Sequence, residues 1–376
     1  MVKSPAVWLG TFVLAKISNC EEGSVLLLEE TIKKIGELDR QAQKRTRLRL
    51  DDLTKPPGSL GMLEEVVVKI AGITGKWMPS LEKKAVIVMA GDHGVVAEGV
   101  SAFPQEVTPQ MVRNFLRGGA AINVLSRHAG AEVVCVDIGV AAPLKEPGLL
   151  SRKIAPGTRN IAEGPAMTLE EARKAIEVGI EVATQEIAAG VQLLATGDMG
   201  IGNTTPSTAI LAAFTGFPVS LIAGKGTGLD DRGLQHKVEV IERALRVNKP
   251  DPRDGLDVLS KVGGFEIGGL AGVILGAAAS RVPVVIDGFI SGAAAMIARA
   301  LAPRVVDYII ASHLSEEPGH KIMLKWLGLE PMIQMRMRLG EGTGAVLAFH
   351  LIEAGLRILR EMATFSEAQV SKKSED

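Results

Sequence analysis

The sequence predicts an α/β fold built on a parallel sheet, because short apolar runs alternate with helical stretches along the chain. Five such runs each end in a polar or glycine-rich loop: residues 85–90, 133–136, 193–195, 284–286 and 305–310. Helical periodicity marks stretches between them, at residues 110–129, 169–188 and 288–300. Strands that alternate with helices pair in parallel through right-handed crossovers, and uninterrupted apolar runs indicate strands buried on both faces.

The N-terminal part predicts two helices before the first strand. Apolar residues at helical spacing, from Leu26 to Leu38, predict one amphipathic helix over residues 25–50. The sequence Lys-Pro-Pro-Gly-Ser-Leu-Gly at residues 55–61 predicts a rigid turn, followed by a helix at residues 63–74. Further upstream, Lys3 precedes an apolar run at residues 6–15 without a clear small-residue cleavage site. We interpret this run as an extra terminal segment or a misplaced start rather than an export signal.

Composition and charge argue against several classes of protein. The chain has 376 residues, a net charge of −1, no basic tract and 3% aromatic residues, so nucleic-acid binding is not expected. The most apolar region, residues 265–302, is interrupted by four charged residues, and its longest uncharged run is shorter than the roughly 20 residues that span a bilayer. Membrane association is therefore not expected. Cys20 and Cys135 match no zinc or disulfide framework, which favours a reducing, cytoplasmic setting.

Polar side chains gather at the predicted strand ends, where parallel α/β sheets bind their ligands. They are Asp92, His93, Asp137, Asp198, Asp287, Ser312 and His313. The pair Asp92-His93 could hold a metal ion, although a polar contact within a loop is the commoner role of such a pair. No two histidines have the spacing of a helical zinc site, and no Gly-x-Ser-x-Gly elbow indicates a hydrolase. No metal site is expected.

A lone carboxylate, Glu341, stands between glycines in the sequence Arg-Leu-Gly-Glu-Gly-Thr-Gly-Ala at residues 338–345. An apolar helix is expected directly after it, at residues 346–354. The glycines allow a tight turn and close approach of a ligand, and a helix start offers free N–H groups to an anion. The pattern suggests a base that acts on a phosphorylated substrate, although a solvated acid in a turn is the commoner role of such a residue.

Two glycine-rich loops are candidates for phosphate binding. The first, residues 196–206, follows a predicted strand and leads into a helix near Pro206, with Asn203, Thr204 and Thr205 as possible caps. It lacks the Gly-Lys-Ser/Thr of a Walker loop and the glycine order of a dinucleotide fingerprint, which argues against an oxidoreductase; a tight structural turn is the alternative. The second loop, residues 224–231, contains Lys225 and is either a phosphate site or a flexible connection.

Six segments, taken together, resemble the nicotinate-nucleotide–dimethylbenzimidazole phosphoribosyltransferase family. They occur in order within about residues 28–364. The segments are residues 55–61, 91–94 (Gly-Asp-His-Gly), 104–108 (Pro-Gln-Glu-Val-Thr), 200–206 (Gly-Ile-Gly-Asn-Thr-Thr-Pro), 312–320 (Ser-His-x-Ser-x-Glu-Pro-Gly-His) and 339–344 (Leu-Gly-Glu-Gly-Thr-Gly).

The resemblance implies transfer of 5-phosphoribose from nicotinate mononucleotide to 5,6-dimethylbenzimidazole, in cobalamin biosynthesis. The products would be α-ribazole 5′-phosphate and nicotinate, with inversion at the anomeric carbon. Glu341 would be the catalytic base, and Asp198, where the family pattern has Glu, a candidate to stabilise the ribosyl cation. Because nicotinate leaves from a cationic pyridinium and no pyrophosphate is released, neither a cofactor nor a metal ion is expected.

The resemblance also assigns substrate-binding residues. Gln105 and Leu339 would line the base pocket, with Met199 beside them. The phosphate would lie on Gly200, Gly202 and Asn203, with Ser315 near. Either Lys225 or Lys237 would assist the phosphate, and Lys237 is taken as the candidate. The preferred base is left open among dimethylbenzimidazole, adenine, other benzimidazoles and phenols.

The family fold is a three-layer Rossmann-like parallel sheet with helices on both faces, plus a small helical domain from both chain ends, in a homodimer. Four parts of this chain are expected accordingly. They are an extension at residues 1–24, a small helical domain at residues 25–80 and 345–365, a catalytic domain at residues 81–344, and a frayed tail at residues 366–376. A catalytically silent paralogue that binds nucleotide or base on the same fold is the alternative.

Overall fold

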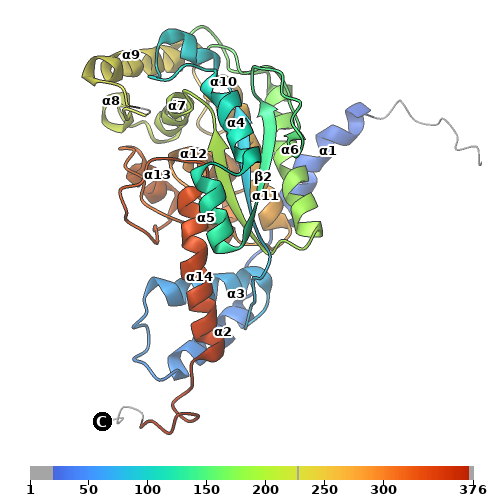
Figure 1. Ribbon diagram of the computed structural model, residues 1–376, viewed down its shortest axis with the longest axis vertical. Coiled ribbons are helices and arrows are strands. Elements are labelled where there is room, and N and C mark those ends of the chain that lie inside the picture. The colour runs from blue at the N-terminus through green and yellow to red at the C-terminus, as the bar shows by residue number, and fades with distance from the viewer. Residues whose placement is uncertain (1–19, 227, 372–376) are drawn as a thin grey trace, which may run out of the picture.

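The computed structural model describes residues 20–226 and 228–371. Most of the expected N-terminal extension, including the apolar run at residues 6–15, lies outside the described residues, as does the end of the expected tail. Figure 1 shows an α/β body above a smaller group of helices, with the C-terminal helix α14 running between them. Within the described part of the chain, no helix is long and apolar enough to cross a membrane.

Six strands form one parallel sheet in the order β3-β2-β1-β4-β5-β6. The chain runs outward from β1 through β2 to β3, returns to the other side of β1 at β4, and continues outward to β6. This reversal creates a topological switch point between the carboxyl ends of β1 and β4, where α/β sheets bind ligands. The strands are β1 (Lys84–Gly91), β2 (Ala131–Gly139), β3 (Leu150–Ser151), β4 (Leu193–Met199), β5 (Val284–Ile286) and β6 (Ile309–Ala311).

Helices cover both faces of the sheet, which confirms the predicted three-layer α/β architecture. Successive residues of β1 alternate between two apolar cores: Ile87 and Met89 pack into one, Val86 and Val88 into the other. The first core is shared with α6, α11 and α12, and the second with α3, α5 and α14. Both faces of the central strands are therefore buried, as their uninterrupted apolar sequences predicted.

The helices differ widely in length. Those before the sheet are α1 (Cys20–Lys34), α2 (Arg40–Asp52) and α3 (Met62–Thr74). Those between the first strand and the fourth are α4 (Val107–Arg117), α5 (Ala121–Ala129) and α6 (Leu169–Ala188). The remainder are α7 (Thr204–Thr215), α8 (Val219–Ile222), α9 (Asp231–Asn248), α10 (Gly255–Val262), α11 (Phe265–Ala279), α12 (Phe289–Leu301), α13 (His320–Leu327) and α14 (Thr343–Glu361). Short 3₁₀ helices occur at Gly94–Glu98 and Pro303–Tyr308.

Three predicted elements differ from the structure. The single helix expected over residues 25–50 is two helices, α1 and α2, because Asp39 caps a new helix by accepting a hydrogen bond from the Ala42 amide at 2.8 Å. The helix expected over residues 110–129 breaks into α4 and α5 at Gly118, which adopts a left-handed conformation. The strand expected over residues 305–310 is a 3₁₀ helix that begins at Pro303, followed by the short strand β6.

The lower group of helices consists of α2, α3 and the C-terminal half of α14 (Figure 1). Leu53 and Thr364 also pair across this group through an isolated antiparallel bridge. The helix α1 instead packs against α6 and α11 of the α/β body. The division of the chain into two domains at residues 80 and 345 remains a prediction.

Two helices of the same face, α6 and α11, pack backbone against backbone. A Cβ atom on Gly179 of α6 would overlap the carbonyl oxygen of Gly269, and one on Gly272 of α11 would overlap the carbonyl oxygen of Ile176. This contact brings α11 onto the sheet, where its residue Glu266 reaches the switch point.

Gly179→Ala is therefore expected to lower the free energy of unfolding by about 1–3 kcal/mol, because the added methyl group forces the two helices apart. The matched control is Gly164→Ala, at a surface turn where an added Cβ would meet nothing within 4 Å. Denaturant titration should show a change within about 0.5 kcal/mol for the control. Equal stabilities for the two variants would contradict the close packing of α6 and α11.

Candidate active site

Glu341 lies on a left-handed turn that rests against the end of β4. Gly340, Glu341 and Gly342 have φ angles of 87°, 62° and 91°. Glycine adopts such left-handed angles without strain, whereas Glu341, which has a Cβ atom, is sterically strained. A Cβ atom on Gly197 of β4 would clash with the carbonyl oxygen of Glu341. The glycine in the strand therefore lets the turn approach the sheet closely, next to the switch point.

The carboxyl group of Glu341 is almost completely removed from water. The residue is 6% exposed, and its Oε2 atom accepts a hydrogen bond of 3.3 Å from the Ile122 amide at the start of α5. Burial raises the pKa of Glu341, the Ile122 amide opposes this effect, and the negative charge of Asp287 adds to it. The alternative of a solvated turn acid is thereby excluded, and a carboxylate with raised proton affinity is suited to act as a base.

A second carboxyl group, that of Asp198, lies near the end of β4. Its Oδ2 atom accepts a hydrogen bond of 2.9 Å from Nδ2 of Asn203. Burial raises the pKa of Asp198 well above its ordinary value, and the charges of Asp287 and Glu266 raise it further. These surroundings oppose ionisation of the Asp198 carboxyl group.

The glycine-rich loop after β4 has a fixed backbone. A Cβ atom on Gly200 would clash with the carbonyl oxygen of Gly91, so the loop lies directly over the end of β1. The Ile201 amide donates to the Thr108 hydroxyl at 3.1 Å, which ties the loop to α4. Asn203 precedes α7 but makes no side-chain cap, because its amide group is turned toward Asp198 instead.

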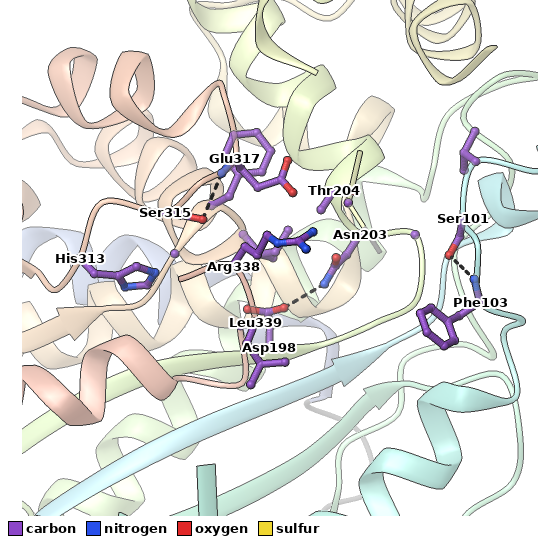
Figure 2. A pocket seen from close by; sticks show the side chains of 17 residues that line it. Ser101, Phe103, Asp198, Asn203, Thr204, His313, Ser315, Glu317, Arg338 and Leu339 are labelled. Atoms are coloured by element: carbon purple, nitrogen blue, oxygen red, sulfur yellow. Dashed lines mark hydrogen bonds between the residues drawn. The ribbon is translucent and has the colours of Figure 1, made fainter. Parts of the chain in front are cut away.

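A cavity of about 450 Å³ opens beside these groups (Figure 2). Its walls come from loops that follow β4, β5 and β6, from the turn before Glu341, and from a loop ahead of α4. Two large apolar side chains in its lining remain exposed, Phe103 at 50% and Leu339 at 59%. The lining includes Ser101, Phe103, Asp198, Gly202, Asn203, Thr204, Gly226, Gly288, His313, Ser315, Glu317, Arg338, Leu339 and Gly340.

One of the two candidate lysines lies behind the cavity wall. Lys237 of α9 is fully buried, and its Nζ atom donates to Thr204 Oγ1 at 2.7 Å and to the Gly224 carbonyl at 3.1 Å. Burial lowers the pKa of Lys237 to about 8, against the opposing charge of Glu317. Lys225 instead forms an exposed ion pair of 2.7 Å with Asp231. The geometry favours Lys237 as the lysine of the site.

The segment from Ser312 to His320 leads from β6 to α13, and its two histidines make structural contacts. The Ser315 amide donates to His320 Nδ1 at 2.9 Å, and burial, with His313 adding to it, lowers the pKa of His320 to about 3. His320 is therefore a neutral acceptor that holds Ser315 at the cavity. His313 Nδ1 lies 3.8 Å from an oxygen of Asp287.

The pair Asp92-His93 is part of a buried polar network. His93 Nε2 lies 2.9 Å from Glu266 Oε1, and Asp92 Oδ2 accepts from the Ala141 amide at 2.8 Å. Burial alone would lower the pKa of His93, but Glu266 raises it above the ordinary value. Throughout residues 20–226 and 228–371, no group of three or more His, Cys, Asp or Glu side chains is placed to hold a metal ion.

Comparison with known proteins identifies the family. A family model described as phosphoribosyltransferase matches residues 35–370. Relatives named nicotinate-nucleotide–dimethylbenzimidazole phosphoribosyltransferase are 62% identical in Desulforamulus reducens and 63% identical in Chloroflexus aggregans, over 92% and 93% of this chain and 99% of each relative. The chain belongs to the nicotinate-nucleotide–dimethylbenzimidazole phosphoribosyltransferase family. The crystal structure of CobT from Thermus thermophilus is also similar, with a TM-score of 0.85 at 50% identity, covering 89% of this chain and 100% of that one.

In this phosphoribosyltransferase, the residues assigned from the sequence lie in three positions. Gln105, Met199 and Gly200 lie beside the cavity, half-buried or buried, rather than in its lining. Glu341 and Lys237 lie directly behind lining residues, next to Gly340 and Thr204 respectively. The five others line the cavity itself: Asp198, Gly202, Asn203, Ser315 and Leu339.

Several residues of the site were missed in the sequence. Phe103, Thr204, Glu317 and Arg338 line the cavity, although no binding role was assigned to them. Glu266 lies below the site on α11, where it is the sole charged residue of that helix. A single acid in an otherwise apolar helix was the available signal, because burying a charge is costly without a specific role.

Lys237→Met should weaken the binding of inorganic phosphate about tenfold, because it removes the buried cation behind Thr204. The matched variant Lys225→Met, which removes an exposed ion pair, should change the affinity by about twofold or less. In the unmodified protein the affinity should fall as the pH rises through about 8, where Lys237 loses its charge. Calorimetric titration checks both effects, and equal affinity in the two variants would remove Lys237 from the site.

Proposed function

We propose that this chain transfers 5-phosphoribose from nicotinate mononucleotide to 5,6-dimethylbenzimidazole, forming α-ribazole 5′-phosphate and nicotinate. The observation that carries the proposal is the dehydrated carboxyl group of Glu341, held at the switch point of the sheet beside a cavity of about 450 Å³. The names of the relatives in the same family support the choice of substrates.

The chemistry requires a base where Glu341 lies. One ring nitrogen of the benzimidazole attacks the anomeric carbon, while Glu341 takes the proton from the other nitrogen. The bond between the ribose and the pyridinium nitrogen breaks, and its electron pair returns to that nitrogen, so nicotinate leaves with a neutral ring. Attack from the face opposite the leaving group inverts the anomeric carbon. Glu341 must be ionised to accept the proton, so turnover should rise as the pH rises through its raised pKa.

Asp198 would respond to the charge of the nucleotide. Burial and neighbouring carboxyl groups raise its pKa in the absence of substrate. The pyridinium ring of nicotinate mononucleotide carries a positive charge, which favours the ionised form of a nearby acid. We infer that Asp198 loses its proton when the nucleotide binds and then stabilises the positive charge that develops on the ribose.

The rest of the cavity fits the two substrates. Thr204, with Lys237 behind it, and Ser315 would hold the phosphate, and Arg338 supplies a second cation for an anionic substrate. Phe103 and Leu339 present apolar surface, which suits a flat heterocycle such as benzimidazole. The same wall would accept other aromatic bases of similar size.

The proposal includes the cellular setting. We propose that the enzyme works in the cytoplasm as a homodimer, without a resident cofactor and without nucleic-acid partners. The net charge of −1 and the paucity of aromatic residues support the last point.

Glu341→Gln should abolish formation of α-ribazole phosphate, a loss on the order of 10³-fold, because glutamine cannot accept the azole proton. Binding of nicotinate mononucleotide should remain within about threefold, since the phosphate contacts are untouched. The matched control is Glu361→Gln at the exposed opposite end of α14, which should leave turnover unchanged. Full turnover in Glu341→Gln would refute the base, and binding of both substrates without turnover by the unmodified chain would favour the silent paralogue.

Binding of nicotinate mononucleotide should release a proton to the buffer at pH values where Asp198 is protonated in the free enzyme. Calorimetric binding enthalpies, measured in two buffers with different ionisation enthalpies, report this release. Asp198→Asn should remove the buffer dependence while leaving a neutral group in the same place. Identical enthalpies in both buffers for the unmodified enzyme would contradict the linkage.

A further inference from the structure

We propose that Asp287 is a positioning residue for the reaction, which holds the turn that carries Glu341 and so fixes where the Glu341 carboxyl group points. This inference rests on the proposed role of Glu341 as the base. Asp287 follows β5, 1% exposed, and no part of the proposed chemistry requires it to touch a substrate.

Three backbone amides converge on the Asp287 carboxylate. Oδ2 accepts a hydrogen bond of 3.1 Å from the Gly342 amide, while Oδ1 accepts from the Gly344 amide at 2.8 Å and from the Ala345 amide at 3.1 Å. These N–H groups lie at the beginning of α14, which has no side-chain cap of its own because Gly342 occupies the N-cap position. An acid after β5 thus caps a helix that begins far along the chain.

The cap fixes the position of Glu341. The turn before α14 has three successive left-handed residues, and the middle one, Glu341, is strained by roughly 1–2 kcal/mol because it is not glycine. The amide of the next residue, Gly342, is held by Asp287, and the carbonyl of Glu341 lies against Gly197 of β4. The turn is therefore clamped between two strands of the sheet, which defines where the carboxyl group can point.

The charge of Asp287 also acts on the base. Burial raises the pKa of Glu341 first, and Asp287 adds to this against the hydrogen bond from Ile122. Other charged groups near the turn include Asp198 on β4, whose pKa Glu266 of α11 also raises, and His313 after β6, which lies 3.8 Å from Asp287. Arg338, three residues before Glu341, lines the cavity. Burial raises the pKa of Asp287 itself, while His313 and the three amides lower it again. Both oxygens of the Asp287 carboxyl group accept hydrogen bonds from N–H groups. The ionised carboxylate, which only accepts hydrogen bonds, therefore fits this arrangement.

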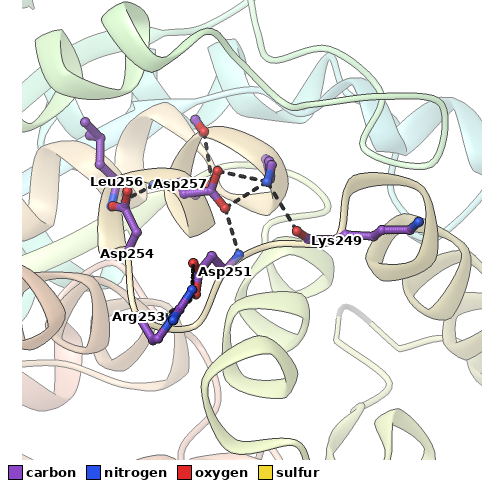
Figure 3. Close-up of polar contacts among 8 residues, drawn as sticks. Lys249, Asp251, Arg253, Asp254, Leu256 and Asp257 are labelled. Atoms are coloured by element: carbon purple, nitrogen blue, oxygen red, sulfur yellow. Dashed lines mark hydrogen bonds and ion pairs between the residues drawn. The ribbon is translucent and has the colours of Figure 1, made fainter.

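A simple helix cap would stabilise α14 without affecting the base, and this difference can be measured. Asp254 provides the matched control: its Oδ1 atom caps α10 by accepting from the Leu256 amide at 2.9 Å and the Asp257 amide at 3.2 Å (Figure 3). It does not line the cavity. Asp254→Asn therefore reports the effect of weakening a helix cap alone.

Asp287→Asn should lower kcat on the order of 10²-fold at neutral pH, because the amide group cannot accept from all three N–H groups and the turn shifts. KM for nicotinate mononucleotide should stay within about threefold. The acid limb of the pH–kcat profile should move to lower pH, since removal of a neighbouring negative charge lowers the pKa of Glu341. Asp254→Asn should leave kcat and the acid limb unchanged, even where it lowers the melting temperature.

Asp287→Ser, a smaller neutral replacement with one acceptor, keeps the test available if the asparagine variant folds poorly, and the acid limb should move in the same direction. An unchanged kcat and acid limb, or a limb moved to higher pH, in either folded variant would overturn the role of Asp287. These results are distinguishable from failure of the proposed function, which would appear as retained turnover in Glu341→Gln.

Discussion

Three carboxyl groups crowded at one edge of a parallel sheet form the constraint on which this site depends. Asp198, Asp287 and Glu341 come from β4, the end of β5 and the turn before α14, and all are buried. In such surroundings each negative charge raises the proton affinity of the others. The fold offsets the cost with directed donors: Asn203 for Asp198, three amides for Asp287, and the Ile122 amide for Glu341. Losing one of these donors would leave a buried carboxyl oxygen unsatisfied, which is costly.

Much of this arrangement could be predicted because its signals are local in the sequence. Apolar runs that end in glycine and aspartate indicated both the parallel sheet and the edge where ligands bind, and the structure confirms the sheet. The glycines around Glu341 indicated a tight turn, and all three residues of that turn are left-handed. Two predicted elements were wrong because a single residue changed the local structure. Asp39 caps a second helix where one continuous helix was expected, and Pro303 begins a 3₁₀ helix where a strand was expected.

The remainder could not be predicted because it depends on pairs that are distant in sequence. Nothing near Asp287 indicates that its partners are amides more than 50 residues later. The choice between Lys225 and Lys237 required knowledge of burial, since α9 brings Lys237 under Thr204 and leaves Lys225 in solvent beside Asp231. Burial also raises the pKa of Asp198, and the charges of Asp287 and Glu266, both distant in sequence, raise it further. Contacts between residues distant in sequence therefore determine the burial and pKa values of the site residues, whereas local sequence patterns determine only the helices, strands and turns.

The helix α14 has a mechanical consequence. It begins beside the base and, 19 residues later, ends among α2 and α3, so one rigid rod of about 28 Å joins the reacting groups to the lower helices (Figure 1). A tilt of about 5° at its distal end, pivoting near the sheet, corresponds to a swing of about 2 Å over that length. Because Glu341 lies at the pivot, such a displacement of the lower helices would reach the turn as a small rotation of the start of α14 rather than as a shift of the carboxyl group.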